Sequence, residues 1–142
     1  MSENNLSSSN LRFLLSEQLE RFNRMDRGYP REALDRVGSH LKSPHVIVIT
    51  GLRRSGKSTL QAQLAQTFFP NDYYYLNFDD ERWTGFETAS FSRIHETLIE
   101  LFGEKHYFLL DEVQNIPRWE LFVRRLYDEG HKLIITGSNA SL

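Results

Sequence analysis

The chain has 142 residues, enough for one domain with its own core, and its 17 basic and 19 acidic residues give a formal charge of −2. A nearly neutral chain exerts no strong overall attraction on nucleic acid or on an anionic membrane surface. It contains no cysteine, which excludes disulfides, zinc ribbons and cysteine nucleophiles.

The first ten residues, MSENNLSSSN, are rich in Ser and Asn, and we expect residues 1–10 to form a disordered tail. They have neither the basic nor the apolar segment of a secretory signal. No apolar run approaches the roughly 20 residues that span a bilayer. We therefore expect a cytoplasmic protein.

Two helices are predicted over residues 11–43, ahead of the main domain. In the first, apolar residues recur at helical spacing from Leu11 onwards, with Ser9 or Asn10 as its N-cap and Gly28 as its end. We expect both helices to pack on the core that follows.

The second helix has Pro30 in its first turn and ends before Pro44. From there, residues 44–142 alternate between strands and helices. Strands are predicted over 45–50, 72–78, 107–110 and 133–136, and helices over 57–69, 88–102 and 117–129. Strands separated by helices are typical of a parallel α/β sheet with helices on both faces.

The first of these strands runs into GLRRSGKST, residues 51–59, which has the pattern of a phosphate-binding loop. Gly56 permits a close approach of the backbone to phosphate, Lys57 reaches the terminal phosphates and Ser58 ligates Mg²⁺. The helix that follows directs the positive end of its dipole at the anion. The predicted ATP-binding residues are Gly51, Arg54, Ser55, Gly56, Lys57, Ser58 and Thr59.

Two arginines, Arg53 and Arg54, lie inside this loop. They are either solvent-exposed charges or additional charge near the γ-phosphate or a neighbouring subunit. No guanine-reading N-K-x-D pattern is visible, which favours ATP over GTP.

Two carboxylates follow the third strand in FLLDEVQ, residues 108–114. The carboxyl ends of parallel strands face the ligand crevice. Asp111 is therefore expected to complete the metal site with Ser58 by holding a Mg²⁺-bound water, and Glu112 to polarise the attacking water. A kinase must exclude that water, so Glu112 favours an ATPase over a small-metabolite kinase.

The fourth strand ends in small polar residues, and either Ser138 or Asn139 is expected to orient the attacking water or sense the γ-phosphate. Asn139 is the preferred catalytic candidate; the alternative is an ordinary turn. The charged loop at 79–82 is either solvated or a substrate or partner contact. The tyrosines at 73–75 are expected to pack in the core rather than stack on bases, and Trp119 to anchor its helix in the core.

Together, ITGLRRSGKSTL, YLNFDDERW, FLLDEVQNIPRWELFVRRLYDEG and KLIITGSNASL resemble the predicted prokaryotic ATPases of the AAA+ superfamily that carry a C-terminal domain of unknown function. The resemblance implies a sheet of order 5-1-4-3-2, truncated here before the fifth strand. It places Walker A at residues 51–59, Walker B at 108–112 and sensor 1 at 138–139. The lid, the arginine finger and the C-terminal domain are expected after residue 142 in such proteins.

Without an arginine finger, ATP hydrolysis by this chain is expected to be weak. The first strand would also present an open edge, which self-association, a swapped segment, the N-terminal helices or the missing C-terminal domain would cover. The main functional hypothesis is an ATPase that couples hydrolysis of Mg-ATP to a partner module. The alternative is an ATP-dependent regulatory switch with little turnover. The charge of −2 gives no support to a nucleic-acid partner.

Overall fold

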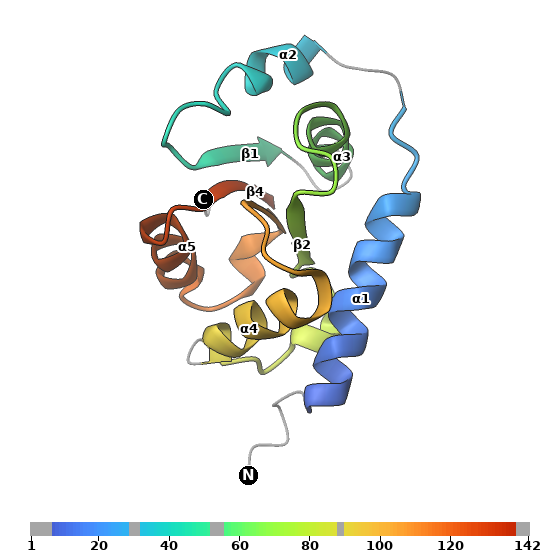
Figure 1. The fold of residues 1–142 in the computed structure, drawn as a ribbon, viewed down its shortest axis with the longest axis vertical. Coiled ribbons are helices and arrows are strands. Elements are labelled where there is room, and N and C mark those ends of the chain that lie inside the picture. The colour runs from blue at the N-terminus through green and yellow to red at the C-terminus, as the bar shows by residue number, and fades with distance from the viewer. Residues whose placement is uncertain (1–6, 29–31, 52–55, 88–89, 139–142) are drawn as a thin grey trace.

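The computed structural model describes residues 7–28, 32–51, 56–87 and 90–138, which form four strands and five α-helices (Figure 1). The strands are β1 (Ile47–Gly51), β2 (Tyr73–Asn77), β3 (Tyr107–Asp111) and β4 (Lys132–Ser138). They lie in the order β1-β4-β3-β2, and all neighbouring pairs are parallel. The predicted α/β fold is confirmed, and this is the strand order that the resemblance implied for the four strands.

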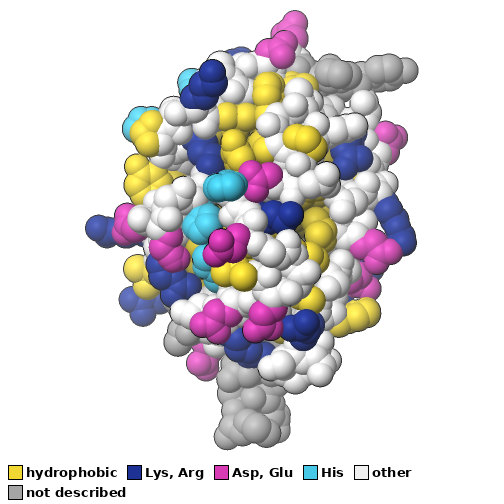
Figure 2. Space-filling model, in the orientation of Figure 1, with side chains coloured by type: hydrophobic (Ala, Val, Ile, Leu, Met, Phe, Trp, Pro, Cys, Tyr) yellow, Lys and Arg dark blue, Asp and Glu magenta, His cyan; other side chains and the backbone are white. Residues whose placement is uncertain are grey.

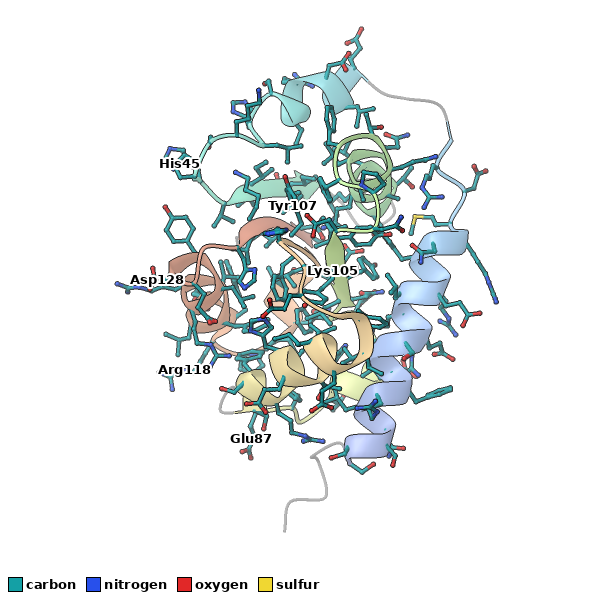
Figure 3. All side chains as sticks on the ribbon, viewed as in Figure 1. His45, Glu87, Lys105, Tyr107, Arg118 and Asp128 are labelled. Carbon is teal, nitrogen blue, oxygen red and sulfur yellow. The ribbon has the colours of Figure 1, made fainter. Side chains whose placement is uncertain are left out.

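Helices cover both faces of the sheet, because successive side chains of each strand point to opposite sides. The helices are α1 (Ser8–Arg24), α2 (Glu32–Gly38), α3 (Lys57–Phe68), α4 (Phe91–Phe102) and α5 (Trp119–Asp128). Tyr73 and Tyr75 belong to one core, which α2 and α3 cover. Tyr74 belongs to the other core, which α4 and α5 cover. Figure 3 shows side chains filling the space between the sheet and these helices.

Helix α1 runs along β2 and closes that edge of the sheet (Figure 1). The amide side chain of Gln18 donates to the carbonyl of Asn77 at 2.8 Å and accepts from its N–H at 3.0 Å. Leu14 is buried in one core and Phe22 in the other, so α1 seals both. The aromatic strand β2 is therefore buried, as the sequence predicted for its tyrosines.

The opposite edge of the sheet is β1, which pairs with β4 alone among the described strands. Val48 in its centre is 50% exposed. On the face shown in Figure 2, basic and acidic side chains are interspersed rather than gathered into a patch of one sign. None of the helices in the described part of the chain combines the length and apolar character that crossing a bilayer requires.

Helix α1 begins earlier than predicted. Residues 8–10 belong to α1, and Ser7, rather than Ser9 or Asn10, is its N-cap, since the Ser7 hydroxyl accepts from the N–H of Asn10 at 3.1 Å. Serine favours both disordered segments and N-caps, so composition alone misjudged this stretch. The helix also ends at Arg24, before Gly28.

Three further helix boundaries differ from the predictions. Helix α2 ends at Gly38, and short turns follow it, while Pro30 lies outside the described residues. Helix α4 begins at Phe91. Helix α5 begins at Trp119, not at residue 117, because Arg118 has a left-handed backbone with φ 59°. Trp119 is only partly buried against the core rather than an anchor within it.

Candidate functional site

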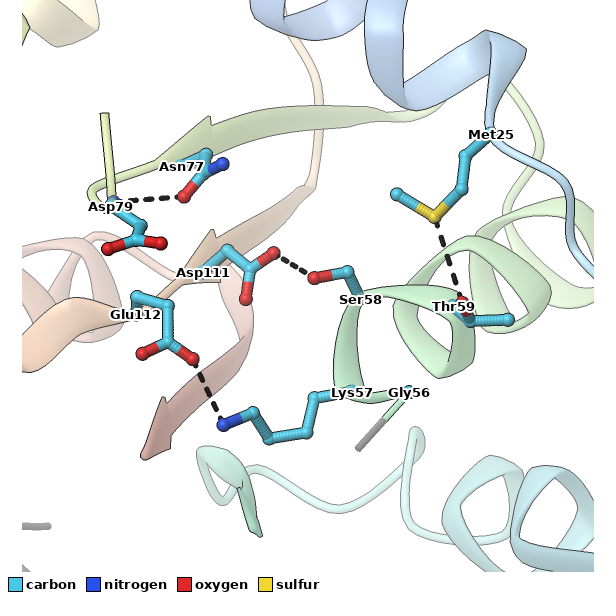
Figure 4. Close-up of a pocket in the computed structure, with 9 residues that line it drawn as sticks. All are labelled: Met25, Gly56, Lys57, Ser58, Thr59, Asn77, Asp79, Asp111 and Glu112. Atoms are coloured by element: carbon cyan, nitrogen blue, oxygen red, sulfur yellow. Dashed lines mark hydrogen bonds and ion pairs between the residues drawn. The ribbon is translucent and has the colours of Figure 1, made fainter. Parts of the chain in front are cut away.

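The candidate site lies where helix α3 begins, beside the carboxyl ends of the strands (Figure 4). Gly56 precedes the helix with φ 89°, a left-handed backbone that favours glycine. A cavity of about 290 Å³ opens here, lined by Met25, Gly56, Lys57, Ser58, Thr59, Asn77, Asp79, Asp111 and Glu112. The first turn of α3 therefore faces the acidic residues at the end of β3.

Lys57 is a buried cation surrounded by oxygen atoms, and it is only 6% exposed. Its Nζ donates to the carbonyls of Gly51 at 2.9 Å and Gly137 at 3.1 Å, and to the hydroxyl of Ser138 at 2.7 Å. It also forms an ion pair with Oε1 of Glu112 at 3.0 Å. The ends of β1, β3 and β4 thus converge on one ammonium group.

Glu112 follows β3 with a left-handed backbone, φ 56° and ψ 52°, which turns its side chain towards Lys57. The Ser138 hydroxyl lies 2.7 and 2.8 Å from its two carboxylate oxygens, and the amide of Gln114 donates to Oε2 at 2.7 Å. Burial of Glu112 disfavours its charge, but the hydrogen bonds from Gln114, Ser138 and Lys57 outweigh burial and hold its pKa below the usual value. The carboxylate is therefore ionised at neutral pH.

Asp111, which is 3% exposed, accepts hydrogen bonds from three hydroxyl groups. Ser58 and Tyr75 donate to Oδ2, the latter at 2.8 Å, and Thr136 donates to Oδ1. Burial raises the pKa of Tyr75 well above its usual value, so its hydroxyl stays protonated. The Thr136 oxygen also accepts from the N–H of Glu112 at 2.9 Å, which links the two carboxylates.

The donor set fits a magnesium ion. Ser58 and Asp111 are in contact, and both offer the oxygen ligands that Mg²⁺ prefers. The Ser58 hydroxyl donates its proton to Asp111 and keeps its lone pairs for a cation. These two residues are the ones that would hold the metal.

The sequence-predicted residues that lie within the described ranges come together here. Gly56, Lys57, Ser58, Thr59, Asp111 and Glu112 line one cavity, and Gly51 contributes its carbonyl to Lys57. Arg54, Ser55 and Asn139, as well as Arg53, lie outside the described residues. Ser138, the second candidate at the tip of β4, contacts both Lys57 and Glu112.

Several residues of the site were assigned no role in nucleotide binding from the sequence alone. Met25, Asn77 and Asp79 line the cavity, and the Thr59 hydroxyl lies 3.9 Å from the Met25 sulfur. Tyr75 and Thr136 bind Asp111 from the interiors of β2 and β4. Asn77 and Asp79 could have been found because the one ends the second strand and the other follows it; nothing local marks the others.

The charged loop after β2 is organised rather than loosely solvated at Asp80 and Arg82. The Arg82 guanidinium forms ion pairs with Asp80 at 2.6 Å and with Glu17 of α1 at 2.7 Å. Hydrogen bonds from Arg82 lower the pKa of Asp80 despite its partial burial. This clamp ties the loop to helix α1, beside the cavity.

A model of the AAA domain family matches residues 43–142 of this chain. A protein of Methanocaldococcus jannaschii described as uncharacterized is 36% identical over 95 residues, which is 67% of this chain and 21% of that protein. A protein of Haemophilus influenzae with the same description is 35% identical over 102 residues, 67% of this chain and 26% of its own length. The chain thus spans about a fifth to a quarter of the length of these curated relatives.

A second M. jannaschii protein, also described as uncharacterized, is 29% identical over 132 residues, covering 86% of this chain and 28% of that protein. Among solved structures, C. elegans PCH-2 aligns with a TM-score of 0.43 and 21% identity over 98% of this chain and 40% of its own.

Proposed function

This chain belongs to the AAA domain family, and we propose that it binds Mg-ATP at the cavity between helix α3 and strand β3 and hydrolyses it. We further propose that hydrolysis is coupled to a partner module. One observation carries the proposal: the Lys57 ammonium, the Ser58 hydroxyl and the two carboxylates of Asp111 and Glu112 meet at one cavity. Membership of the family indicates nucleotide binding, and hydrolysis of ATP is what we propose in addition.

Binding of the triphosphate requires a cation and backbone N–H groups at one point. Helix α3 begins at Lys57 and has no acidic residue in its first turn, so the positive end of its dipole and the N–H groups that lack an intrahelical partner suit a phosphate. Lys57 is held by Glu112, Ser138 and two carbonyls. We propose that the terminal phosphates take the place of Glu112 at the ammonium group.

Magnesium, when bound by Ser58 and Asp111, supplies positive charge that neutralises the phosphate oxygens during transfer. Asp111 fits this role because hydroxyl groups, rather than cations, satisfy its oxygens, so its negative charge remains for the metal.

Glu112 is the residue that we propose accepts a proton from the attacking water. Its lowered pKa keeps it ionised at neutral pH, which a general base requires. Once Lys57 turns to phosphate, Oε1 of Glu112 loses its cation and becomes the stronger acceptor. The Ser138 hydroxyl remains to orient the carboxylate.

Glu112→Gln tests this proposal. We expect ATP affinity within about threefold of the wild type and a fall in hydrolysis on the order of 10² to 10⁴, the usual contribution of a general base. Isothermal titration and a phosphate-release assay measure the two quantities. Glu104→Gln, at the exposed opposite end of β3, is the matched control and should change neither. Unchanged hydrolysis in Glu112→Gln would contradict the role of Glu112.

A second candidate function is an ATP-dependent switch with little turnover. Both carboxylate oxygens of Glu112 already have partners in Lys57, Ser138 and Gln114, and this arrangement would suit a sensor that is released by nucleotide. Such a switch predicts wild-type protein that binds ATP without measurable hydrolysis, and Glu112→Gln would then leave the fate of bound ATP unchanged.

The outer edge of β1 supports the proposed coupling to another segment or a second copy. Val48 is half exposed there, and unpaired edge strands are ready partners for a further strand. We expect self-association that rises with concentration, measured by light scattering. A monomer at all concentrations would contradict pairing with a second copy and leave only pairing of β1 with another segment.

A further inference from the structure

Tyr75 connects the buried interior of β2 with the predicted metal ligand. Its hydroxyl donates to Oδ2 of Asp111 at 2.8 Å, and both residues are at most 5% exposed. The two residues are 36 positions apart in the sequence and meet because β2 and β3 are neighbouring parallel strands. No water is needed to bridge them.

The carboxylate of Asp111 is held at both of its oxygens. Thr136 donates to Oδ1 and Tyr75 to Oδ2, from the strands on either side of β3. A carboxylate with a donor on each oxygen cannot rotate freely about its Cβ–Cγ bond, so its plane is set before any cation arrives. Both donors are neutral, and neither competes with a cation for the charge of Asp111.

The ring of Tyr75 is itself held by helix α1. Phe22 stacks on it with ring centroids 4.0 Å apart and 18° between the planes, and Phe22 is 1% exposed. The position of the Tyr75 hydroxyl therefore depends on how α1 packs along β2.

The three consecutive tyrosines of β2 all use their hydroxyl groups, but in different places. Tyr73 donates to the side chain of Asn23 at 2.6 Å, and Tyr74 donates to the carbonyl of Gly103 at 2.5 Å. Tyr73 shares the face of Tyr75 and also packs against Phe22, at 5.7 Å between centroids. Tyr73 therefore provides a control with the same ring, the same face and the same neighbour, but without the contact to Asp111.

We propose that Tyr75 is a positioning residue that orients Asp111 for magnesium, and that Phe22 of helix α1 holds Tyr75 in place. This inference rests on the proposed Mg-ATP site. Residues that hydrogen-bond to a metal ligand commonly affect metal affinity about 10- to 100-fold, although they do not touch the metal.

The test compares Tyr75→Phe with Tyr73→Phe in the 142-residue chain. Calorimetric titrations give ATP affinity in EDTA and at increasing Mg²⁺, and hence the Mg²⁺ concentration for half-maximal enhancement. For Tyr75→Phe we expect this concentration to rise about 10-fold, with ATP affinity in EDTA unchanged. Tyr73→Phe should match the wild type in both measurements.

If the Tyr75 hydroxyl only stabilised the fold, the two variants would not differ in the Mg²⁺ concentration that they require. Each variant loses one hydrogen bond, so urea unfolding should show a modest destabilisation of both, whereas only Tyr75→Phe should require more Mg²⁺. If Tyr75→Phe does not fold, Phe22→Leu tests the same link, since it keeps the hydroxyl and removes the stacked ring; we expect a rise in half-maximal Mg²⁺ of about threefold.

Three outcomes overturn the proposal. One outcome is that the wild type binds ATP in a Mg²⁺-dependent way while Tyr75→Phe and Tyr73→Phe both keep its half-maximal Mg²⁺ concentration. In that case the positioning role is wrong and the proposed function stands. An equal rise in both tyrosine variants would indicate a general packing effect. Wild-type protein that binds no ATP, or binds it equally well in EDTA, would overturn the magnesium site together with this inference.

Discussion

Each end of the sheet has a cavity lined by ionisable side chains. The cavity at the carboxyl end has a volume of about 290 Å³, and the one at the amino end about 270 Å³. At the carboxyl end, Lys57 and Glu112 form a buried ion pair, and hydroxyl groups satisfy Asp111. At the amino end, His95 and His131 lie against each other, with ring centroids 5.2 Å apart, and both pack on the ring of Phe108.

The two cavities differ in how their charges are satisfied. Burial lowers the pKa of His95, and the neighbouring His131 lowers it further, while Glu129 acts in the opposite direction. The amino end therefore favours the neutral form of His95, whereas the carboxyl end holds Lys57 and Glu112 as a buried ion pair. Burial of polar groups does not by itself indicate a ligand site; an ionisable group in a cleft whose pKa is shifted by burial and by a specific charged partner is the more informative sign.

The largest difference between the two ends should appear in nucleotide binding. Lys57→Ala removes the cation. Loss of its charged hydrogen bonds should cost about 2.7 kcal/mol of binding free energy, which makes the affinity for Mg-ATP about 100-fold weaker. Lys105→Ala at the amino end should leave the affinity unchanged. Calorimetric titration checks both, with circular dichroism to verify folding. Equal affinities in the two variants would contradict the assignment of the carboxyl end.

Thr136→Val tests whether the carboxyl-end network also stabilises the fold. Thr136 is fully buried, and its hydroxyl serves both Asp111 and the N–H of Glu112. Valine fills the same space but leaves two polar groups unpaired, so we expect a loss of about 2 kcal/mol in the free energy of unfolding.

Urea unfolding measures this loss. The matched control is Thr97→Val on α4, where the hydroxyl only donates to the carbonyl of Arg93 one turn earlier. We expect this control to change stability by at most about 0.5 kcal/mol. A Thr136→Val protein as stable as the control would show that the network contributes nothing to folding.

A smaller effect should appear at the amino end as a dependence of stability on pH. The folded pKa of His95 lies below its ordinary value of 6.5, so protonation favours the unfolded chain. The free energy of unfolding is therefore not reduced by His95 above about pH 6.5, and it decreases as the pH falls towards the folded pKa.

We expect His95→Gln to lose less stability than the wild type between about pH 7.5 and pH 5.5 in urea unfolding. His106→Gln, whose side chain is 83% exposed, should behave like the wild type. An identical pH dependence in all three proteins would show that protonation of His95 does not cause the loss of stability.

The smallest effect is expected for the exposed pair at the same end. His106 lies 2.9 Å from Asp72, but their side chains are 83% and 38% exposed. Solvent screens such pairs, so Asp72→Asn should cost at most about 0.5 kcal/mol. A much larger loss in urea unfolding would mean that this contact organises the amino end.

Much of the site was predictable because its main residues fall in two short stretches, each with a recognisable local pattern. Lys57 and Ser58 follow a glycine at a strand-to-helix turn, and Asp111 and Glu112 directly follow an apolar strand. In a parallel sheet these two points must lie at the same end. Periodicity also predicted the four strands, although helix ends moved wherever a cap or a left-handed residue decided them.

Tyr75, Thr136 and Met25 were not predictable in the same way. Their residue types are those of ordinary core positions, and only the register of neighbouring strands and the packing of α1 bring them to Asp111 and to the cavity. The sequence by itself determined the α/β alternation, the glycine turn and the acidic pair, because these depend on local spacing. Only the tertiary structure decided which hydroxyl groups satisfy Asp111 and that Lys57 pairs with Glu112, because those contacts join strands distant in the chain.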